Sequence, residues 1–185
     1  MRQAERYRRR RTNRNICARV RRSASGKNGR MRVEMDRIKF TLRDMTQDDA
    51  PYLAQMEQDI FTDPWSESTY RELFRYSYYI KVVAETDDRI AGCACMTMLG
   101  GEGDIDRVMV DAGLRGQGIG SALVQRLLQS GRERGAEEFT LEVRESNQAA
   151  IRLYEKNGFV SEGVRPGFYE KPKEDALIMW IRSRS

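Results

Sequence analysis

The sequence contains no histidine and only three cysteines among its 185 residues. The absence of histidine excludes a Ser-His-Asp triad, a histidine proton shuttle and a histidine-ligated zinc. Any general base must therefore be a carboxylate, a tyrosine, a lysine, a cysteine or a water molecule that one of them holds. The cysteines, Cys17, Cys93 and Cys95, are too few and too unevenly spaced for a disulfide framework, which indicates a reducing compartment.

Long hydrophobic runs are also missing. No apolar stretch approaches the roughly 20 residues that a membrane-spanning helix needs, and the N-terminal region lacks the apolar core of a secretory signal. We therefore expect a cytoplasmic protein with no membrane partner, and we expect a monomer. The length suits one domain with an appendage, and the sequence shows no internal repeat.

Acidic residues are nearly absent from the first 32 positions, which hold 12 arginines, one lysine and the single acid Glu5. The formal charge of this segment is +12, whereas the rest of the chain has 20 basic and 27 acidic residues and carries −7. We divide the chain into a basic extension, residues 1–35, and an acidic domain, residues 36–185. A composition of this kind cannot bury a core, so we expect the extension to be disordered.

The role of the extension stays open at this point. It is either an arm that contacts RNA, the ribosome or another acidic surface, or a dispensable or wrongly assigned N-terminus. Met31 and Met35 both stand where a compact domain could start. A third interpretation is that the arginine-rich arm folds back into an acidic acceptor groove and inhibits the protein.

Hydrophobic periodicity predicts alternating strands and helices in the acidic domain. Helices are expected over residues 46–61, from Ser66 to residue 76, after the glycine-rich segment 114–120, and over 147–159. Strands are expected over residues 38–45, 78–86, 89–98, 103–110, 137–144, 159–164 and 175–181. This order predicts an α/β protein, more strictly an α+β mixed sheet, with helices on both faces.

One segment, "LRGQGIGSALVQRLLQ" (residues 114–129), carries three glycines directly before an apolar-periodic helix. The first N–H groups of a helix lack intrahelical partners and carry partial positive charge, so they bind anions. The spacing of Gly116, Gly118 and Gly120 is not the G-x-G-x-x-G of a dinucleotide fold, and no Walker lysine follows. From the spacing alone, a phosphate-binding loop and a structural turn are equally supported.

The stretch Arg115-Gly116-Gln117-Gly118-Ile119-Gly120 resembles the R/Q-x-x-G-x-G/A loop of the GNAT superfamily of N-acetyltransferases. "LEVRESNQAAIRLYEKNGF" (residues 141–159) is a second feature of that superfamily. "DPWSE" (63–67) and "EDALIMW" (174–180) resemble one branch, the RimI-type ribosomal-protein-alanine N-acetyltransferases of bacteria. The resemblance covers residues 38–181.

The resemblance implies a GNAT fold and acetyl-CoA as the acetyl donor, without a metal. It also implies direct transfer to the N-terminal alanine of a small-subunit ribosomal protein whose N-terminus bears arginine. The residues implied in acetyl-CoA binding are Val108, Met109 and Val110 for the pantetheine arm, Arg115, Gly116, Gln117, Gly118, Ile119, Gly120 and Ser121 for the pyrophosphate, and Asn147. One departure is Arg115-Gly116, which stands where many relatives carry Gln-Arg.

Two residues are implied in catalysis. Glu142 lies in a predicted strand on the face shared by Thr140 and Arg144, and the resemblance makes it the general base; alternatively it pairs with Arg144 or another surface cation. Tyr154 is implied as the acid that protonates the departing thiolate, and the alternative is a core tyrosine. Asn147 has the alternative role of a helix N-cap.

Other chemistry-bearing residues receive weaker assignments. Trp65 and Tyr169 are expected to line the acceptor site, with Tyr169 in the segment 165–175 that closes over the peptide in this branch. Cys93 and Cys95 share a strand face and are expected in the core. Asp104 and Asp106 also share a face; they contact a basic acceptor or are solvated strand ends.

Two alternatives to N-terminal acetylation of a ribosomal protein are kept. In the first, the fold and reaction are retained but the acceptor is another protein N-terminus, a lysine or a polyamine. In the second, the chain is a ribosome- or RNA-binding protein whose affinity comes from the +12 extension.

Overall fold

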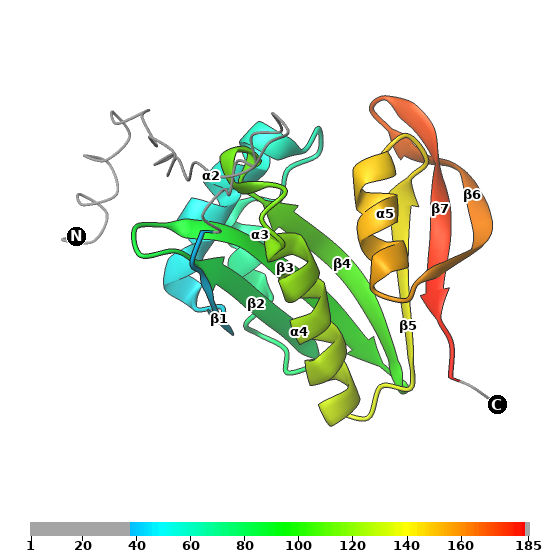
Figure 1. Cartoon of the computed structure of the whole chain (residues 1–185), viewed down its shortest axis with the longest axis horizontal. Helices are drawn as coiled ribbons and strands as arrows, with labels where there is room; N and C mark the ends of the chain where they lie inside the picture. Colours follow the sequence, from blue (N-terminus) through cyan, green and yellow to red (C-terminus); the bar gives the residue numbers. More distant parts are fainter. Residues whose placement is uncertain (1–37, 184–185) are drawn as a thin grey trace, which may run out of the picture. The chain divides into compact units, whose positions relative to one another are not determined.

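The computed structural model describes residues 38–183, so the expectations for the extension at residues 1–35 lie outside the described part of the chain. The described residues form one seven-stranded sheet in the order β1-β2-β3-β4-β5-β7-β6 (Figure 1). The strands are β1 (Thr41–Asp44), β2 (Tyr79–Glu85), β3 (Ile90–Leu99), β4 (Glu102–Val110), β5 (Glu138–Arg144), β6 (Val160–Glu170) and β7 (Lys173–Ile181). Every neighbouring pair is antiparallel except β4 and β5, which are parallel.

Helices cover both faces of the sheet, as predicted. The helices are α2 (Ala50–Ile60), α3 (Glu67–Glu72), α4 (Ile119–Glu133) and α5 (Gln148–Lys156), with the 3₁₀ turns η1 (Gln47–Asp49) and η2 (Ala112–Leu114). Helices α4 and α5 lie over one face, and α2 and α3 lie over the other (Figure 1). No helix in residues 38–183 is long and apolar enough to cross a membrane.

The helix boundaries follow from local sequence signals. Ser66 caps α3, and its hydroxyl accepts a hydrogen bond from the Thr69 amide at 3.1 Å. Asn157 is the C-cap of α5, and the next residue, Gly158, adopts the left-handed conformation at φ 97° that favours glycine. The predicted inner face of α4 is confirmed, because Leu123, Val124, Leu127 and Leu128 are all buried.

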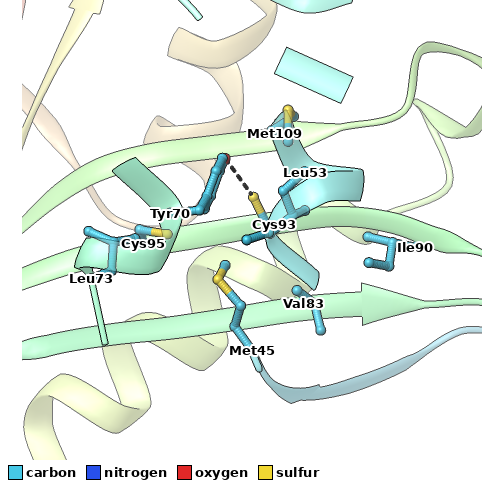
Figure 2. Packing of buried hydrophobic residues seen from close by; sticks show 10 residues of the cluster. Met45, Leu53, Tyr70, Leu73, Val83, Ile90, Cys93, Cys95 and Met109 are labelled. Carbon is cyan, nitrogen blue, oxygen red and sulfur yellow. Dashed lines mark hydrogen bonds between the residues drawn. The ribbon is translucent and has the colours of Figure 1, made fainter. Parts of the chain in front are cut away.

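The core beneath α2 and α3 is shown in Figure 2. Leu53 from α2 and Tyr70 from α3 pack against Val83, Cys93 and Met109 of three adjacent strands. The Tyr70 hydroxyl lies 3.5 Å from the Cys93 sulfur. Cys93 is buried and unpaired, as Cys95 is, and the prediction that both are core residues is confirmed.

The largest difference from the predicted elements is the last hairpin. Strand β6 runs to Glu170 and β7 starts at Lys173, so the segment expected to lie between the strands is mostly strand itself. Its register is irregular between Arg165 and Tyr169. Most residues of β6 are exposed, so the alternation of apolar and polar residues that marks a half-buried strand is absent.

Candidate active site

The feature that creates the site is the separation of two parallel strands. Strands β4 and β5 pair only from Glu102 to Asp104 and from Glu138 to Thr140. Beyond these residues the facing edges of the two strands diverge, and a cavity of about 1040 Å³ occupies the gap. Because backbone N–H and C=O groups require partners, an unpaired edge inside a sheet is a natural place for a ligand backbone.

The cavity reaches both faces of the sheet. On the face covered by α4 and α5, residues of the glycine loop and of α5 line it, including Gly116, Gly118, Ser121, Asn147 and Tyr154. On the opposite face it is lined by the α2–α3 loop, the end of β5 and the last hairpin, including Phe61, Arg107, Glu142, Arg144 and Tyr169. Most sequence-predicted site residues therefore surround one space.

The glycine loop presents backbone amides to this cavity. Gly116 and Gly118 have φ values of 77° and 86°, a conformation that side chains with a Cβ rarely adopt. Gly118 is the N-cap of α4, and the amides of Ile119, Gly120 and Ser121 donate no hydrogen bond within the described residues. The loop thus places a helix N-terminus with free amides, a type of site that suits anions, at the edge of the cavity.

The side chains around this loop have structural partners. The Arg115 Nε donates to the Val110 carbonyl oxygen at 3.2 Å, and the Ser121 hydroxyl donates to the Asn157 side chain at 3.2 Å. A Cβ on Gly120 would lie 3.3 Å from Leu153 of α5, so glycine permits the close approach of the two helices. Gln117 is half-buried and is not among the residues that line the cavity.

Asn147 is the N-cap of α5, and it also borders the cavity. Its side-chain oxygen accepts a hydrogen bond from the Ala150 amide at 3.2 Å and caps α5, which confirms the N-cap interpretation. Asn147 also lines the cavity. The N-termini of α5 and α4 therefore border the same cavity.

Glu142 projects to the face opposite α4 and α5, as strand alternation predicts. Its carboxylate forms an ion pair with Arg165 of β6 at 2.9 Å, and its side chain is 26% exposed. Arg165 is 57% exposed, so this cation is largely solvated. The alternative expectation, a pair with Arg144 or another surface cation, is therefore confirmed for a surface cation, Arg165, whereas Arg144 pairs with Glu174 at 3.1 Å.

Tyr154 is buried in α5 and lines the cavity, and its ring packs edge-on against Phe159 at 5.8 Å between centroids. Burial raises the pKa of its phenol well above the usual value, so the hydroxyl keeps its proton at neutral pH. Its hydroxyl has no hydrogen-bond partner among residues 38–183. A buried, protonated donor therefore lines the space between the strands.

The two expected acceptor-site aromatics are separated. Tyr169 lines the cavity, and its hydroxyl donates to the Glu142 carbonyl oxygen at 3.4 Å. Trp65 does not line this cavity; its ring packs against Tyr70, and it borders a smaller neighbouring hollow. The Arg107 guanidinium lies over the Trp65 ring at 4.5 Å and connects the two regions.

Arg144 fixes the hairpin wall of the cavity. Its guanidinium donates to the carbonyl oxygens of Lys171 and Pro172 at 3.0 and 3.1 Å, in addition to the ion pair with Glu174. The same group stacks on the Tyr169 ring at 4.0 Å. One side chain of β5 therefore holds the tip of the β6–β7 hairpin beside the cavity.

Sequence reasoning missed a buried ion pair next to the site. Glu57 of α2 is fully buried; it accepts hydrogen bonds from the Tyr70 hydroxyl at 2.8 Å and the Trp65 amide at 3.1 Å. The Arg107 Nε lies 3.4 Å from the Glu57 carboxylate and has no hydrogen-bond partner within the described residues. Arg107 also stacks on Phe61 at 4.3 Å. It thereby fastens the α2–α3 loop to β4.

A signal for Glu57 was present in the sequence. Ala50 and Leu53 are buried in α2, and Glu57 continues the same helical stripe four residues later. An acid in an apolar stripe indicates a buried partner. No sequence pattern marked Arg107 as the partner of Glu57. The β3–β4 register is irregular next to the pair of Cys95 with Arg107, so simple strand alternation does not predict the face on which Arg107 lies.

Carboxylates gather on the face of β4 and β5 that lies opposite α4 and α5. Asp104 is opposite Thr140 in register, and its partial burial and the nearby Glu142 raise its pKa to about 6. Desolvation of the Asp106 carboxylate and the charge of Asp104 raise the pKa of Asp106 to about 6 as well, although a hydrogen bond from Thr97 opposes this shift. The expectation that Asp104 and Asp106 are solvated strand ends is therefore incomplete, because the Asp104 side chain is half-buried.

Comparison with known proteins agrees with this geometry. The acetyltransferase (GNAT) family model matches residues 50–159. The [ribosomal protein bS18]-alanine N-acetyltransferase of Salmonella typhimurium is 33% identical over 141 residues, which cover 75% of this chain and 95% of the relative.

Two solved structures are similar. The ribosomal-protein-S18-alanine N-acetyltransferase of Escherichia coli has a TM-score of 0.72 and 31% identity, covering 80% of this chain and 96% of that one. Ard1 of Thermoplasma volcanium has a TM-score of 0.71 and 27% identity, covering 79% and 99%.

The open mixed sheet with its amide-lined cavity thus belongs to an acyltransferase. The chain is a member of the GNAT acetyltransferase family, whose enzymes use acetyl-CoA. The predicted fold class and enzyme class are confirmed.

The buried ion pair leads to a prediction about stability. The substitution Arg107→Met is expected to lower the free energy of unfolding by about 3 kcal/mol, because it leaves the Glu57 carboxylate buried without its cation. Chemical denaturation measures this value. The double variant Glu57→Gln/Arg107→Met should recover part of the loss.

The matched control for this measurement is Arg71→Met, which breaks the exposed i,i+4 pair with Glu67 on α3. Its effect should stay within about 0.5 kcal/mol. An Arg107→Met variant as stable as this control would contradict the assignment.

The carboxylate cluster predicts a pH dependence. Folded Asp104 has a pKa of about 6 against an ordinary 3.8, so the stability present below about pH 4 is lost as pH rises through 6. The variant Asp104→Asn should be more stable than the wild type by about 1 kcal/mol near pH 7.5, allowing for solvent screening. The difference should vanish below about pH 4, whereas Asp87→Asn, on the exposed β2–β3 turn, should show no difference at either pH.

Proposed function

We propose that the chain is an acetyl-CoA-dependent protein N-terminal acetyltransferase that modifies the N-terminal alanine of a small-subunit ribosomal protein. The observation that carries the proposal is the gap between β4 and β5. It joins the amide-lined N-termini of α4 and α5 on one face to Glu142 and neighbouring carboxylates on the other. The names of the relatives from Salmonella and Escherichia coli support the acceptor.

The residues of the donor side fit acetyl-CoA. The free amides from Gly116 to Ser121 suit the pyrophosphate, and the unpaired edge of Val108–Val110 suits the amide groups of the pantetheine arm. Asn147 adds a polar group at the same opening. When bound, acetyl-CoA supplies an acetyl thioester that is open to attack by an amine.

Glu142 has the role of general base. An ammonium group has no lone pair, so the acceptor must lose a proton before it attacks. An α-amino group with a pKa of about 7.7–8.0 loses it more easily than a lysine at about 10.4, so a carboxylate acting directly or through one water suffices. The ion pair with the solvated Arg165 orients the Glu142 carboxylate and leaves a second oxygen for this task.

Tyr154 has the role of proton donor. Its raised pKa keeps the phenol neutral, and its hydroxyl lines the cavity without a protein partner among the described residues. A neutral phenol in this position donates a hydrogen bond or a proton to the departing thiolate. Tyr154 and Glu142 flank the cavity from opposite faces of the sheet, which suits one acid and one base.

The acidic surroundings suit a basic acceptor. Asp104 lies near Glu142, Asp106 lines the same cavity, and residues 33–185 carry −7. These charges attract an N-terminus that bears arginine. Other protein N-termini, lysines and polyamines share this positive charge and remain the alternative acceptors. We further propose that the chain is a cytoplasmic monomer.

A second candidate function rests on the +12 charge of residues 1–32. We infer that a basic extension, residues 1–35, precedes the enzyme domain, residues 36–185, and contacts RNA or the ribosome. In the alternative form of this proposal, binding of RNA or the ribosome is the main function of the chain, and the acetyltransferase domain only supports the extension.

The acceptor can be identified directly. The full-length protein is incubated with acetyl-CoA and a mixture of ribosomal proteins, and intact-mass and peptide mass spectrometry locate any added acetyl group. We expect a single acetyl group on the N-terminal alanine of one small-subunit protein. Acetylation of lysines or polyamines instead would favour the alternative acceptors, and no acetylation at all would favour the RNA-binding function.

The catalytic assignments predict a kinetic pattern. Glu142→Gln and Tyr154→Phe should each lower kcat about 100-fold, because each removes one proton-transfer group. Neither should change acetyl-CoA affinity, measured by calorimetry, by more than about twofold. The controls are Glu145→Gln and Tyr78→Phe, both at exposed positions outside the cavity lining. Full activity in both site variants would reject the acid–base pair.

A further inference from the structure

The α2–α3 loop, residues 61–66, forms one wall of the active-site cavity through Phe61, Thr62 and Asp63. Within residues 38–183, no backbone hydrogen bond joins residues 62–65 of this loop to a strand. An irregular segment without such bonds keeps its place through side-chain contacts. These contacts therefore decide the shape of the cavity on the face opposite α4 and α5.

Arg107 of β4 contacts this loop through its guanidinium group. The group lies over the rings of Phe61 and Trp65, at 4.3 and 4.5 Å from their centroids, and its Nη2 donates to the Asp63 carbonyl oxygen at 3.4 Å. A planar guanidinium can stack on aromatic faces and donate hydrogen bonds from its edge at the same time. One side chain of the sheet therefore contacts three residues of the loop.

Glu57 of α2 holds this guanidinium in place. Its carboxylate lies 3.4 Å from the Arg107 Nε and accepts a hydrogen bond from the Trp65 amide at 3.1 Å. Glu57 is fully buried and the Arg107 side chain is 15% exposed, so solvent screens this pair little. The Glu57 carboxylate thereby fixes both the guanidinium and the end of the loop.

The position of Arg107 along β4 connects this attachment to the reaction. Under the proposed function, the pyrophosphate binds at the N-terminus of α4 and the pantetheine arm follows β4 from Val110 to Val108, so the thioester lies near Val108. Arg107 is the next residue, and it lines the cavity on the face opposite α4 and α5. Burial raises the pKa of the Tyr154 and Tyr169 phenols, and the charge of Arg107 opposes this rise at both. The guanidinium therefore lies within electrostatic reach of groups on both sides of the cavity.

We propose that Arg107 is a positioning residue for the acceptor, because it holds the α2–α3 loop against β4 and so fixes the wall beside which the amino group approaches the thioester. The inference rests on the proposed function and adds a residue outside the proposed acid–base pair. Lysine at this position replaces the charge of Arg107 but not its contacts, since an ammonium group cannot lie flat over two rings. Loss of the guanidinium weakens acceptor binding and leaves coenzyme binding at the glycine loop unchanged.

The test compares the full-length wild type with the double variant Glu57→Gln/Arg107→Met, which removes the guanidinium without leaving a buried carboxylate unpaired. Acetyl transfer to a hexapeptide that begins with alanine is measured at saturating acetyl-CoA. We expect KM for the peptide to rise about tenfold while kcat and the calorimetric affinity for acetyl-CoA stay within about twofold of the wild type. Arg107→Lys, which keeps the charge, should raise KM only about threefold.

Arg71→Met is the matched control. It also removes a paired guanidinium, but Arg71 pairs with Glu67 on the exposed side of α3 and is not among the residues that line the cavity. This variant should leave KM and kcat at their wild-type values. A rise in KM of the same size in Arg71→Met and in the double variant would contradict the role of Arg107.

Hydrogen exchange measured by mass spectrometry gives a readout that a general loss of stability does not reproduce. Peptides that cover residues 61–66 should exchange about tenfold faster in the double variant, whereas those that cover α4 should keep their wild-type rates. An equal increase in both regions would show a global loss of stability and would overturn the positioning role.

The two readouts separate this inference from the proposed function. If the wild type acetylates no peptide, the proposed function fails, and the exchange rates of residues 61–66 decide whether Arg107 holds the loop. If the double variant acetylates the peptide with unchanged KM, the positioning role is wrong while the function stands. A fall in kcat with unchanged KM would also overturn it, because Arg107 would then act in the chemical step.

Discussion

The divergence of β4 and β5 is the constraint on which the other features of the site depend. Only three residues of each strand pair with the other strand. Beyond them the edges of β4 and β5 no longer pair with each other and border a cavity. A continuous parallel pairing would satisfy more backbone groups but would close the route between the two faces. The sheet therefore gives up hydrogen bonds that a bound coenzyme can replace.

Local signals explain why much of the fold could be predicted from the sequence. Ser66 caps a helix, Gly116 and Gly118 occupy left-handed conformations, and the alternation in β5 directs Glu142 away from the buried Phe139. Each of these depends on a few neighbouring residues. The resemblance to a known superfamily suggested the proposed catalytic roles of Glu142 and Tyr154, which local physics left open between catalysis and structure.

Features that depend on distant contacts could not be predicted. Arg107 is 50 residues from Glu57 in the sequence, and only the folded sheet brings them together. Trp65 was expected at the acceptor site, yet it packs on Tyr70 and borders the smaller hollow. The length of the β6–β7 hairpin could not be predicted either, because the exposed residues of β6 show no alternation of apolar and polar side chains.

The attachment of that hairpin through Arg144 has a consequence for how such enzymes diverge. The wall holding Tyr169 is fastened by the contacts of one guanidinium with Lys171, Pro172 and Glu174, whereas the glycine loop belongs to another part of the sheet. Under the proposed function, mutations in the hairpin tip alter the acceptor side of the cavity and leave the proposed coenzyme loop unchanged. New specificities can evolve on this scaffold without rebuilding its chemical machinery.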